Sequence, residues 1–366
     1  MSEVFVDDPV IDPEEMRDAA KRLLADRVDI RATYAEPSRD EADPLFSAMT
    51  ELGWTLLTVP ADMEGLGQSF AALAPIYEEM GRVTAPVALF PSLASLELLT
   101  LADAGDQAHK LAGQVAIGVA QVAVGLVPPG VLTVKGGTLT GELGSVPADS
   151  RTTHLLVLIE DESPSAWLVD FASAGVTMQQ TEMWDRSRRV IDISLDCVSA
   201  SGLLESSVAD VLGRVRAHID LAIAWDSLGG AKRSLEETVA YMLTRQQFGR
   251  QIGSFQALKH RAADHKVAIE IAAALVRHAT GAFAAGHAGA EILAGQARLI
   301  ANDAYHAMAE DSVQLHGGIG FTWEHDCHLF LKRALLNEML YETPDQRRDR
   351  LAPSVIEHAM ADRACT

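Results

Sequence analysis

The chain has 366 residues, of which 48% are hydrophobic and 22% charged, as is typical of a folded globular protein rather than a disordered one. Its 30 Lys and Arg against 51 Asp and Glu give a formal net charge of −21, which argues against nucleic acid or an anionic membrane as a partner. The three cysteines form no C-x-x-C pair and the acidic N-terminus has no apolar signal segment, so we expect a cytoplasmic protein without disulfides.

The first predicted domain, 1–113, is helical. Asp12 precedes a proline and two glutamates, which is the pattern of a helix N-cap followed by an acidic first turn. Residues 70–82 repeat apolar side chains at helical spacing, and this spacing places Glu78 and Glu79 off the apolar face. We therefore expect several short amphipathic helices in this part of the chain.

The second predicted domain, 114–203, is built of strands. Six short runs rich in β-branched residues are separated by Gly, Pro, Asp and Ser. Their close spacing predicts an antiparallel sheet or a small β-barrel.

The third predicted domain, 204–366, returns to helical periodicity. Four long Ala- and Leu-rich helices are expected, at 208–244, 254–285, 287–315 and 325–340. Long helices joined by short links are typical of an antiparallel bundle. The predicted fold class is therefore α+β, with N-terminal helices, a middle β domain and a C-terminal four-helix bundle.

Several common site patterns are missing from the sequence. It contains no G-x-G-x-x-G after a strand, no P-loop, no G-x-S-x-G and no H-E-x-x-H. One polar cluster would face different ways on a helix, which argues against a metal site at His325, Asp326, Cys327 and His328. One basic cluster could meet a phosphate but more often such a loop is simply solvated: Arg186, Arg188 and Arg189.

Residues 245–260 are distinctive because an arginine, an aromatic residue and a glutamine converge on one short link between two helices. Gly249 and Gly253 indicate a tight connection. Arg245 could simply complement a helix C-terminus, and Phe248 could simply pack. Neither explanation accounts for their convergence with Gln256.

Residues 314–324 form the second distinctive segment. Three glycines follow the end of a predicted helix, so a backbone there could approach a ligand closely. An ordinary helix C-cap and turn is the alternative explanation of this segment.

In this order and separation, after a β domain, the two segments resemble the acyl-CoA dehydrogenase family. Residues 52–67 are similar to the family's N-terminal signature, and 78–82 to the helix that follows it. Residues 229–230 and 331–334 also match, so the resemblance covers essentially the whole chain.

The resemblance implies FAD as cofactor, an acyl-CoA thioester as substrate and α,β-dehydrogenation, with the flavin carrying the redox chemistry. In the family, these two segments reach across a subunit interface to a neighbour's FAD. Arg245 would then pair with the pyrophosphate, with Phe248 and Gln256 beside it. A further set would line the adenosine diphosphate end of the cofactor: Gln314, Leu315, Gly317 and Gly318.

The chain departs from the family pattern at its own flavin and base positions. The family's T-E-P-x-x-G-S-D motif is missing from the corresponding region, 119–130. An ungapped alignment from Gly317 puts Tyr341, not Glu342, at the usual base position, and the other family position holds Ile219 with Asp220 beside it. We predict no catalytic residue in this chain and expect Glu342 to be a solvent-exposed loop carboxylate.

These selective losses resemble one subunit of the actinobacterial heteromeric α2β2 acyl-CoA dehydrogenases of steroid degradation. The resemblance implies a second, base-supplying subunit, a bulky sterol side-chain thioester and electron-transfer flavoprotein or a similar acceptor. Two alternatives stay open. One is a self-sufficient homo-oligomer that uses Glu342 as base, and the other is a scaffold subunit without a redox role.

Overall fold

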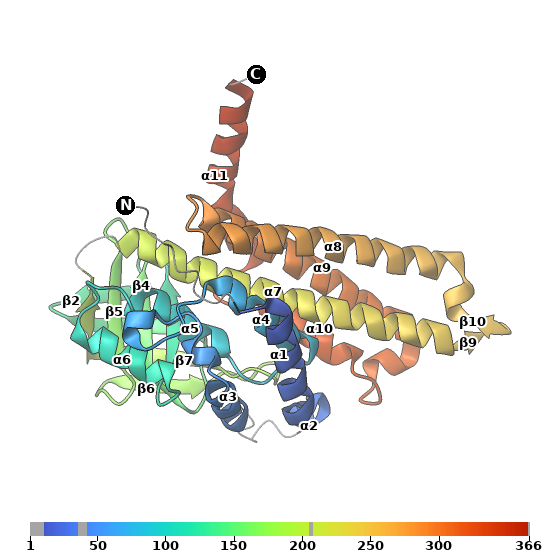
Figure 1. Ribbon diagram of the computed structural model, residues 1–366, viewed down its shortest axis with the longest axis horizontal. Helices are drawn as coiled ribbons and strands as arrows, with labels where there is room; N and C mark the ends of the chain where they lie inside the picture. The colour runs from blue at the N-terminus through green and yellow to red at the C-terminus, as the bar shows by residue number, and fades with distance from the viewer. Residues whose placement is uncertain (1–10, 36–41, 205–207, 365–366) are drawn as a thin grey trace, which may run out of the picture.

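The structure, a computed structural model, describes residues 11–35, 42–204 and 208–364. A β domain lies at one end of a long helical bundle, and the N-terminal helices pack along the side of both (Figure 1). This arrangement has the predicted α+β class. The secondary structure changes near the predicted divisions, since α6 ends at Ala116 and α7 begins at Val208.

The N-terminal part contains six α-helices. They are α1 Pro13–Arg27, α2 Ile30–Ala35, α3 Ala42–Glu51, α4 Ala74–Arg82, α5 Leu89–Leu99 and α6 Asp106–Ala116, with 3-10 turns at Trp54–Leu56, Ala61–Met63 and Phe70–Ala72. The predicted cap is confirmed, because the Asp12 side chain accepts a hydrogen bond from the Glu14 amide at 2.9 Å.

Glu78 and Glu79, which the helical spacing places off the apolar face of the helix, do not face solvent. Both are buried, because α4 packs between α1 and α7 and has no solvated side. Arg17 of α1 donates to Glu78 at 2.6 Å, and Lys232 of α7 donates to it at 2.5 Å. These partners compensate the buried charge.

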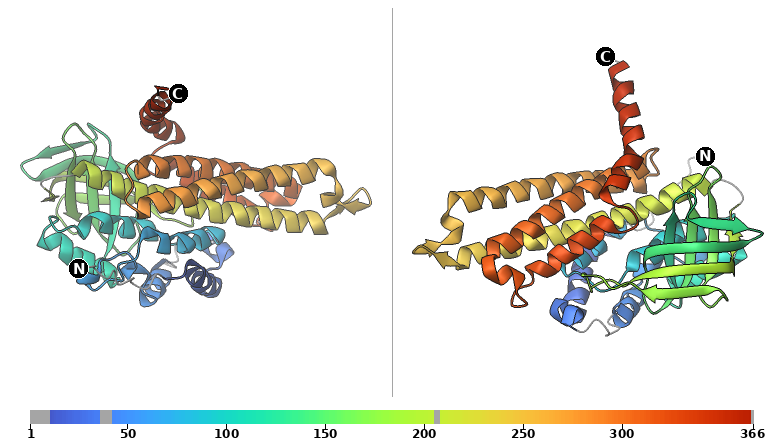
Figure 2. Two further views of the ribbon diagram at one scale, coloured as in Figure 1. Left: turned by 45° about the horizontal axis from the view of Figure 1, so that its top comes forward. Right: turned by 180° about the vertical axis from the view of Figure 1, so that it is seen from behind.

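The middle part is two four-stranded sheets packed face to face, not a barrel (Figure 2). Its strands are β1 Gln121–Val127, β2 Leu132–Lys135, β3 Thr138–Pro147, β4 Thr152–Ile159, β5 Ser165–Asp170, β6 Val176–Gln180, β7 Val190–Ser199 and β8 Ser201–Leu203. One sheet, in the order β2-β3-β7-β6, is antiparallel as predicted. The other, β1-β4-β5-β8, is mixed because β1 and β4 run parallel.

The mixed sheet is buried on both faces. Val157 and Leu155 of β4 belong to the core between the sheets, whereas Leu156 and Leu158 belong to the main core shared with the helices. Helix α5 covers this outer face by packing on β1. Burial on both sides explains the continuous apolar run of β4 and accommodates a parallel pair.

The C-terminal part is the predicted bundle of four long helices (Figure 1). They are α7 Val208–Thr244, α8 Gln256–Ala284, α9 Ala290–His316 and α10 Cys327–Met339. Two mid-helix glycines let α7 approach its neighbours, since a Cβ on Gly229 would overlap the Glu78 carbonyl and one on Gly230 would overlap the Tyr305 ring. Helix α7 is thus the central element, in contact with α4, α5, α8 and α9.

Two helices stand out at the edge of the bundle. Helix α8 is long and apolar enough to cross a membrane by length and composition, but in this structure it packs on α7 and α9. A further helix, α11 Pro344–Ala364, is not among the predicted ones and projects away from the bundle (Figure 2).

Candidate functional site

The first predicted segment forms a hairpin at the far tip of the bundle (Figure 1). Strands β9 Gln246–Gln247 and β10 Arg250–Gln251 pair antiparallel after α7 ends. The two turn residues, Phe248 with φ 51° and Gly249 with φ 75°, are both left-handed, as a two-residue type I′ turn requires. The chain therefore makes the tight connection that its glycines predict.

The Phe248 side chain is displayed rather than packed. It is 91% exposed, and its only described ring contact is with Phe255, at 6.2 Å between centroids. A bulky residue at positive φ is unfavourable. Simple packing therefore does not explain Phe248, which presents an aromatic face to whatever approaches the tip.

The Arg245 guanidinium is also free. Its backbone amide donates to Tyr241 at 2.8 Å and its carbonyl accepts from Ile252 at 2.9 Å, so the backbone is fixed. Within the described residues its exposed side chain makes no hydrogen bond or ion pair. Gln256, the first residue of α8, is exposed beside the hairpin.

The second predicted segment lies at the same end of the bundle. Helix α9 ends at His316, and Gly317 turns the chain with φ 64° into a 3-10 turn, Gly317–Phe321. A Cβ at Gly317 or Gly318 would meet nothing within 4 Å, so both glycines border open space. Gln314 is exposed on the last turn of α9.

The Leu315 side chain packs between the two predicted segments. It is 8% exposed and packs in a small core with Met242 and Ile252, beneath the hairpin. The Tyr241 hydroxyl donates to the His316 carbonyl at 3.4 Å, which adds a polar link. The structure thus brings all seven predicted residues to one end of the bundle, with six at the surface and Leu315 as their support.

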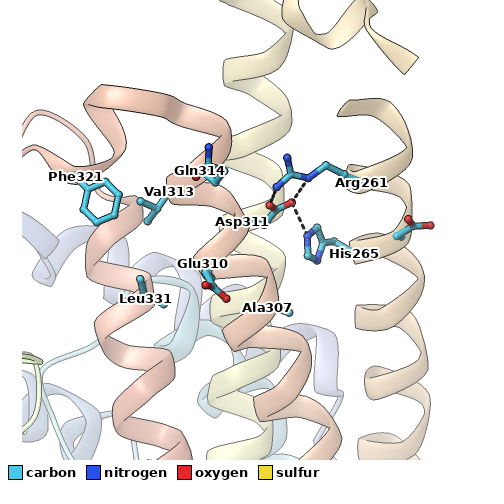
Figure 3. Close-up of a pocket in the computed structure, with 10 residues that line it drawn as sticks. Arg261, His265, Ala307, Glu310, Asp311, Val313, Gln314, Phe321 and Leu331 are labelled. Atoms are coloured by element: carbon cyan, nitrogen blue, oxygen red, sulfur yellow. Dashed lines mark hydrogen bonds and ion pairs between the residues drawn. The ribbon is translucent and has the colours of Figure 1, made fainter. Parts of the chain in front are cut away.

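A groove beside Gln314 extends this surface (Figure 3). It holds about 670 Å³ between α8, α9 and α10 and is bordered by Phe321. Asp311 accepts a hydrogen bond from Arg261 at 3.1 Å and lies 2.9 Å from His265 Nε2. Arg261, His265 and Asp311 are not among the residues predicted from the sequence. The i, i+4 pair Arg261 and His265 on α8 is the signal that could have found them.

Glu342 is not a solvated loop carboxylate, contrary to expectation. Its side chain is 15% exposed; Arg216 donates to it at 2.6 Å and Arg350 at 2.9 and 3.0 Å. Burial alone would raise its pKa, but the Arg350 hydrogen bond and the Arg216 charge outweigh burial and hold the pKa below its usual value.

Asp220 is held in the same network. Arg298 donates to it at 2.9 Å and Arg350 at 3.3 Å. Burial would raise its pKa as well, but the nearby arginine charges lower it. Both carboxylates are therefore held in ion pairs with arginines in the folded chain.

The predicted basic loop contains Arg186, Arg188 and Arg189. Its central residue, Arg188, is neither solvated nor open to a phosphate. Arg188 is buried and donates to Asp226 of α7 at 2.6 Å and to Asn337 of α10 at 3.0 Å. Arg333 lies in the same cluster and donates to the Ala85 carbonyl at 2.6 Å. Charged side chains therefore occupy the contact between the middle domain loop, α7 and α10.

Two family models match most of the folded chain. The acyl-CoA dehydrogenase N-terminal domain matches residues 12–112, and the acyl-CoA dehydrogenase C-terminal domain matches 217–352. The acyl-CoA dehydrogenase IpdE2 of Mycobacterium tuberculosis is 32% identical over 356 residues, which cover 94% of this chain and 98% of that protein. The chain belongs to the acyl-CoA dehydrogenase family. FAD is the cofactor typical of the family.

Two solved structures carry the same fold over nearly their whole length. The Tcur3481-Tcur3483 steroid acyl-CoA dehydrogenase, solved as a variant, has a TM-score of 0.85 and 26% identity, with 95% of this chain and 98% of that chain covered. The ChsE4-ChsE5 complex from Mycobacterium tuberculosis has a TM-score of 0.83 and 21% identity, covering 98% of this chain and 99% of that one. The fold is therefore that of an acyl-CoA dehydrogenase subunit.

The residues at the tip fit one end of FAD. A free guanidinium suits a pyrophosphate, an exposed aromatic ring suits a planar heterocycle, and two glycines without obstruction let a backbone approach closely. By contrast, paired charges already fill the regions around Glu342 and Arg188.

Proposed function

We propose that this chain is one subunit of a heteromeric FAD-dependent acyl-CoA dehydrogenase and that its bundle tip completes the FAD site of a different partner subunit in an α2β2 assembly. The observation that supports this most strongly is the contrast between the two predicted regions. Arg245 and Phe248 are free at the tip, whereas Glu342 is bound by arginines.

In this proposal the residues of the tip bind and orient the cofactor. Arg245 would hold the pyrophosphate with a fork of two N–H groups, which is the strongest kind of charge-assisted hydrogen bond. Phe248 would pack beside the pyrophosphate and Gln256 would hydrogen-bond there, while Gln314 would line the adenosine diphosphate end. When bound, FAD supplies the acceptor for the hydride that leaves the β-carbon.

The base is expected from the partner. Removing an α-proton needs a carboxylate that is not already neutralised, and both candidates in this chain have lowered pKa values. The structural relative that is named a steroid dehydrogenase supports a bulky acyl-CoA thioester as substrate. An electron-transfer flavoprotein or a similar protein would reoxidise the cofactor.

The test is the flavin content of the chain alone and of its complex. The chain expressed alone should bind little FAD, and co-expression with a dehydrogenase-like partner should give one FAD for each pair of unlike subunits. A lone chain that carries a full complement of FAD and turns over substrate would overturn the proposal in favour of the self-sufficient enzyme. A complex whose FAD content is independent of the tip residues would favour the scaffold.

A further inference from the structure

Two histidines and a buried cysteine converge beside the glycine turn. His316 is the last residue of α9, His325 lies in the loop before α10, and Cys327 is the first residue of α10. Their possible ligand atoms all lie within 4.8 Å of one another. His325 lies before α10 and not on the helix with Cys327, so the expectation that these side chains face different ways on one helix does not describe their placement.

His316 has the arrangement of a metal ligand. Its Nδ1 lies 2.7 Å from the Ser312 carbonyl, which can only accept, so Nδ1 carries the proton and Nε2 carries the lone pair. The residue is 3% exposed, and its Nε2 is buried without a hydrogen-bond partner. Buried polar atoms are rarely left unpaired, and ligating histidines commonly donate their other N–H to a carbonyl.

His325 and Cys327 complete the cluster. The centroids of the His325 and His316 rings are 4.0 Å apart. His325 Nδ1 accepts one long hydrogen bond of 3.3 Å from the Cys327 amide. The Cys327 thiol is buried and donates only to the Gly320 carbonyl, at 3.3 Å.

We propose that His316, His325 and Cys327 bind a zinc ion, with water from the adjoining pocket as the fourth ligand. Two imidazoles and a thiolate are ligands that Zn²⁺ accepts in tetrahedral geometry. Tetrahedral zinc separates such ligand atoms by about 3.3 to 3.6 Å, so the cluster must close by about 1 Å. A pocket of about 360 Å³ reaches the cluster at His325 and is also lined by Arg31, Glu237 and Asp326, so an ion could enter on the side of His325.

The ion would join three elements that already pack against one another. It would link the end of α9, the loop after Gly317–Phe321 and the start of α10, next to the Tyr241 ring that stacks on His316 at 4.4 Å. Zinc would therefore fix the glycine turn in place. The site stands on its own ligands and does not depend on the proposed role in FAD binding.

The test uses the full chain without a histidine tag, in a Cys197→Ser/Cys365→Ser background that leaves Cys327 as the only cysteine of the sequence. Titration with Co²⁺ should saturate at one ion per chain and give a thiolate-to-cobalt charge-transfer band that Zn²⁺ then abolishes. Cys327→Ser should lose the band. His316→Ala and the less buried His325→Ala should each weaken binding by about tenfold or more.

The matched control is His278→Ala, which removes an exposed histidine of α8 and should change nothing. Circular dichroism shows whether each variant folds, and zinc should raise the unfolding midpoint of the parent but not of His325→Ala. A band that persists in Cys327→Ser, or equal affinity in parent and both histidine variants, would overturn the site.

Discussion

Replacing Arg245 by alanine tests the role of the bundle tip most directly. The side chain is exposed and has no partner within the described residues, so its removal breaks no contact inside the chain. Exposed substitutions of this kind usually change the free energy of unfolding by less than about 0.5 kcal/mol. Any larger effect must come from what binds there.

The expected loss follows from the contact that the guanidinium would make. A hydrogen bond to a charged group contributes about 1.5–3 kcal/mol. This corresponds to an increase in the dissociation constant of FAD by about 10- to 150-fold. The dissociation constant of FAD for Arg245→Lys should lie between those for the parent and for Arg245→Ala, because an ammonium keeps the charge but loses the planar fork.

The assay is fluorescence titration of the flavin-free complex with FAD, alongside the unfolding midpoint of each variant. Arg22→Ala is the matched control, because Arg22 is an exposed arginine of α1, far from the tip and without an ion-pair partner in the described part of the chain. An FAD affinity for Arg245→Ala within about twofold of the parent, which is under about 0.5 kcal/mol, would refute the reasoning.

Three further substitutions test the interior. Glu342→Gln should lower the free energy of unfolding by about 1–3 kcal/mol in urea denaturation, yet leave turnover of the complex intact; lost turnover with FAD retained would instead identify a base. The pKa of Asp220 is lowered in the folded state, so its stabilisation is present above its unfolded pKa of about 4 and lost as pH falls below it; Asp220→Asn should flatten this acid-induced loss in pH-dependent unfolding. Gly229→Ala should destabilise the chain by about 1–3 kcal/mol through overlap with α4 in thermal unfolding, whereas Gly113→Ala, with open space around it, should not.

Helices with strong apolar periodicity are predictable from this sequence, and α7 agrees with its prediction at both ends. Helix α11 is not predicted from the sequence because it is polar, contains Pro353 and buries little of its surface. The parallel pairing of β1 and β4 is not predictable for a different reason. A continuous run of apolar residues indicates that a strand is buried on both faces. It does not indicate which neighbouring strand it pairs with or whether the pair is parallel.

The residues of the candidate site are likewise predictable only in part from the sequence. Arg245, Phe248 and the glycines lie in two short contiguous segments, so a local pattern is enough to find them. The pairs that fix Glu342 and Arg188 join residues up to 149 positions apart in sequence, and no local pattern encodes them. The cluster of His316, His325 and Cys327 is intermediate, since its members are close in sequence but come together only because a turn reverses the chain between them.

The distribution of arginine resolves the apparent conflict between an acidic chain and an anionic cofactor. Five buried arginines are Arg188, Arg216, Arg298, Arg333 and Arg347, and each lies against a carboxylate. At physiological ionic strength charges are screened over about 8 Å, so the net charge of −21 has little influence on a phosphate at the tip. What counts there is the local charge, and within the described residues Arg245 and Lys259 are exposed without an ion-pair partner. A chain that neutralises its interior arginines while leaving these cations free is suited to holding an anion presented by another subunit.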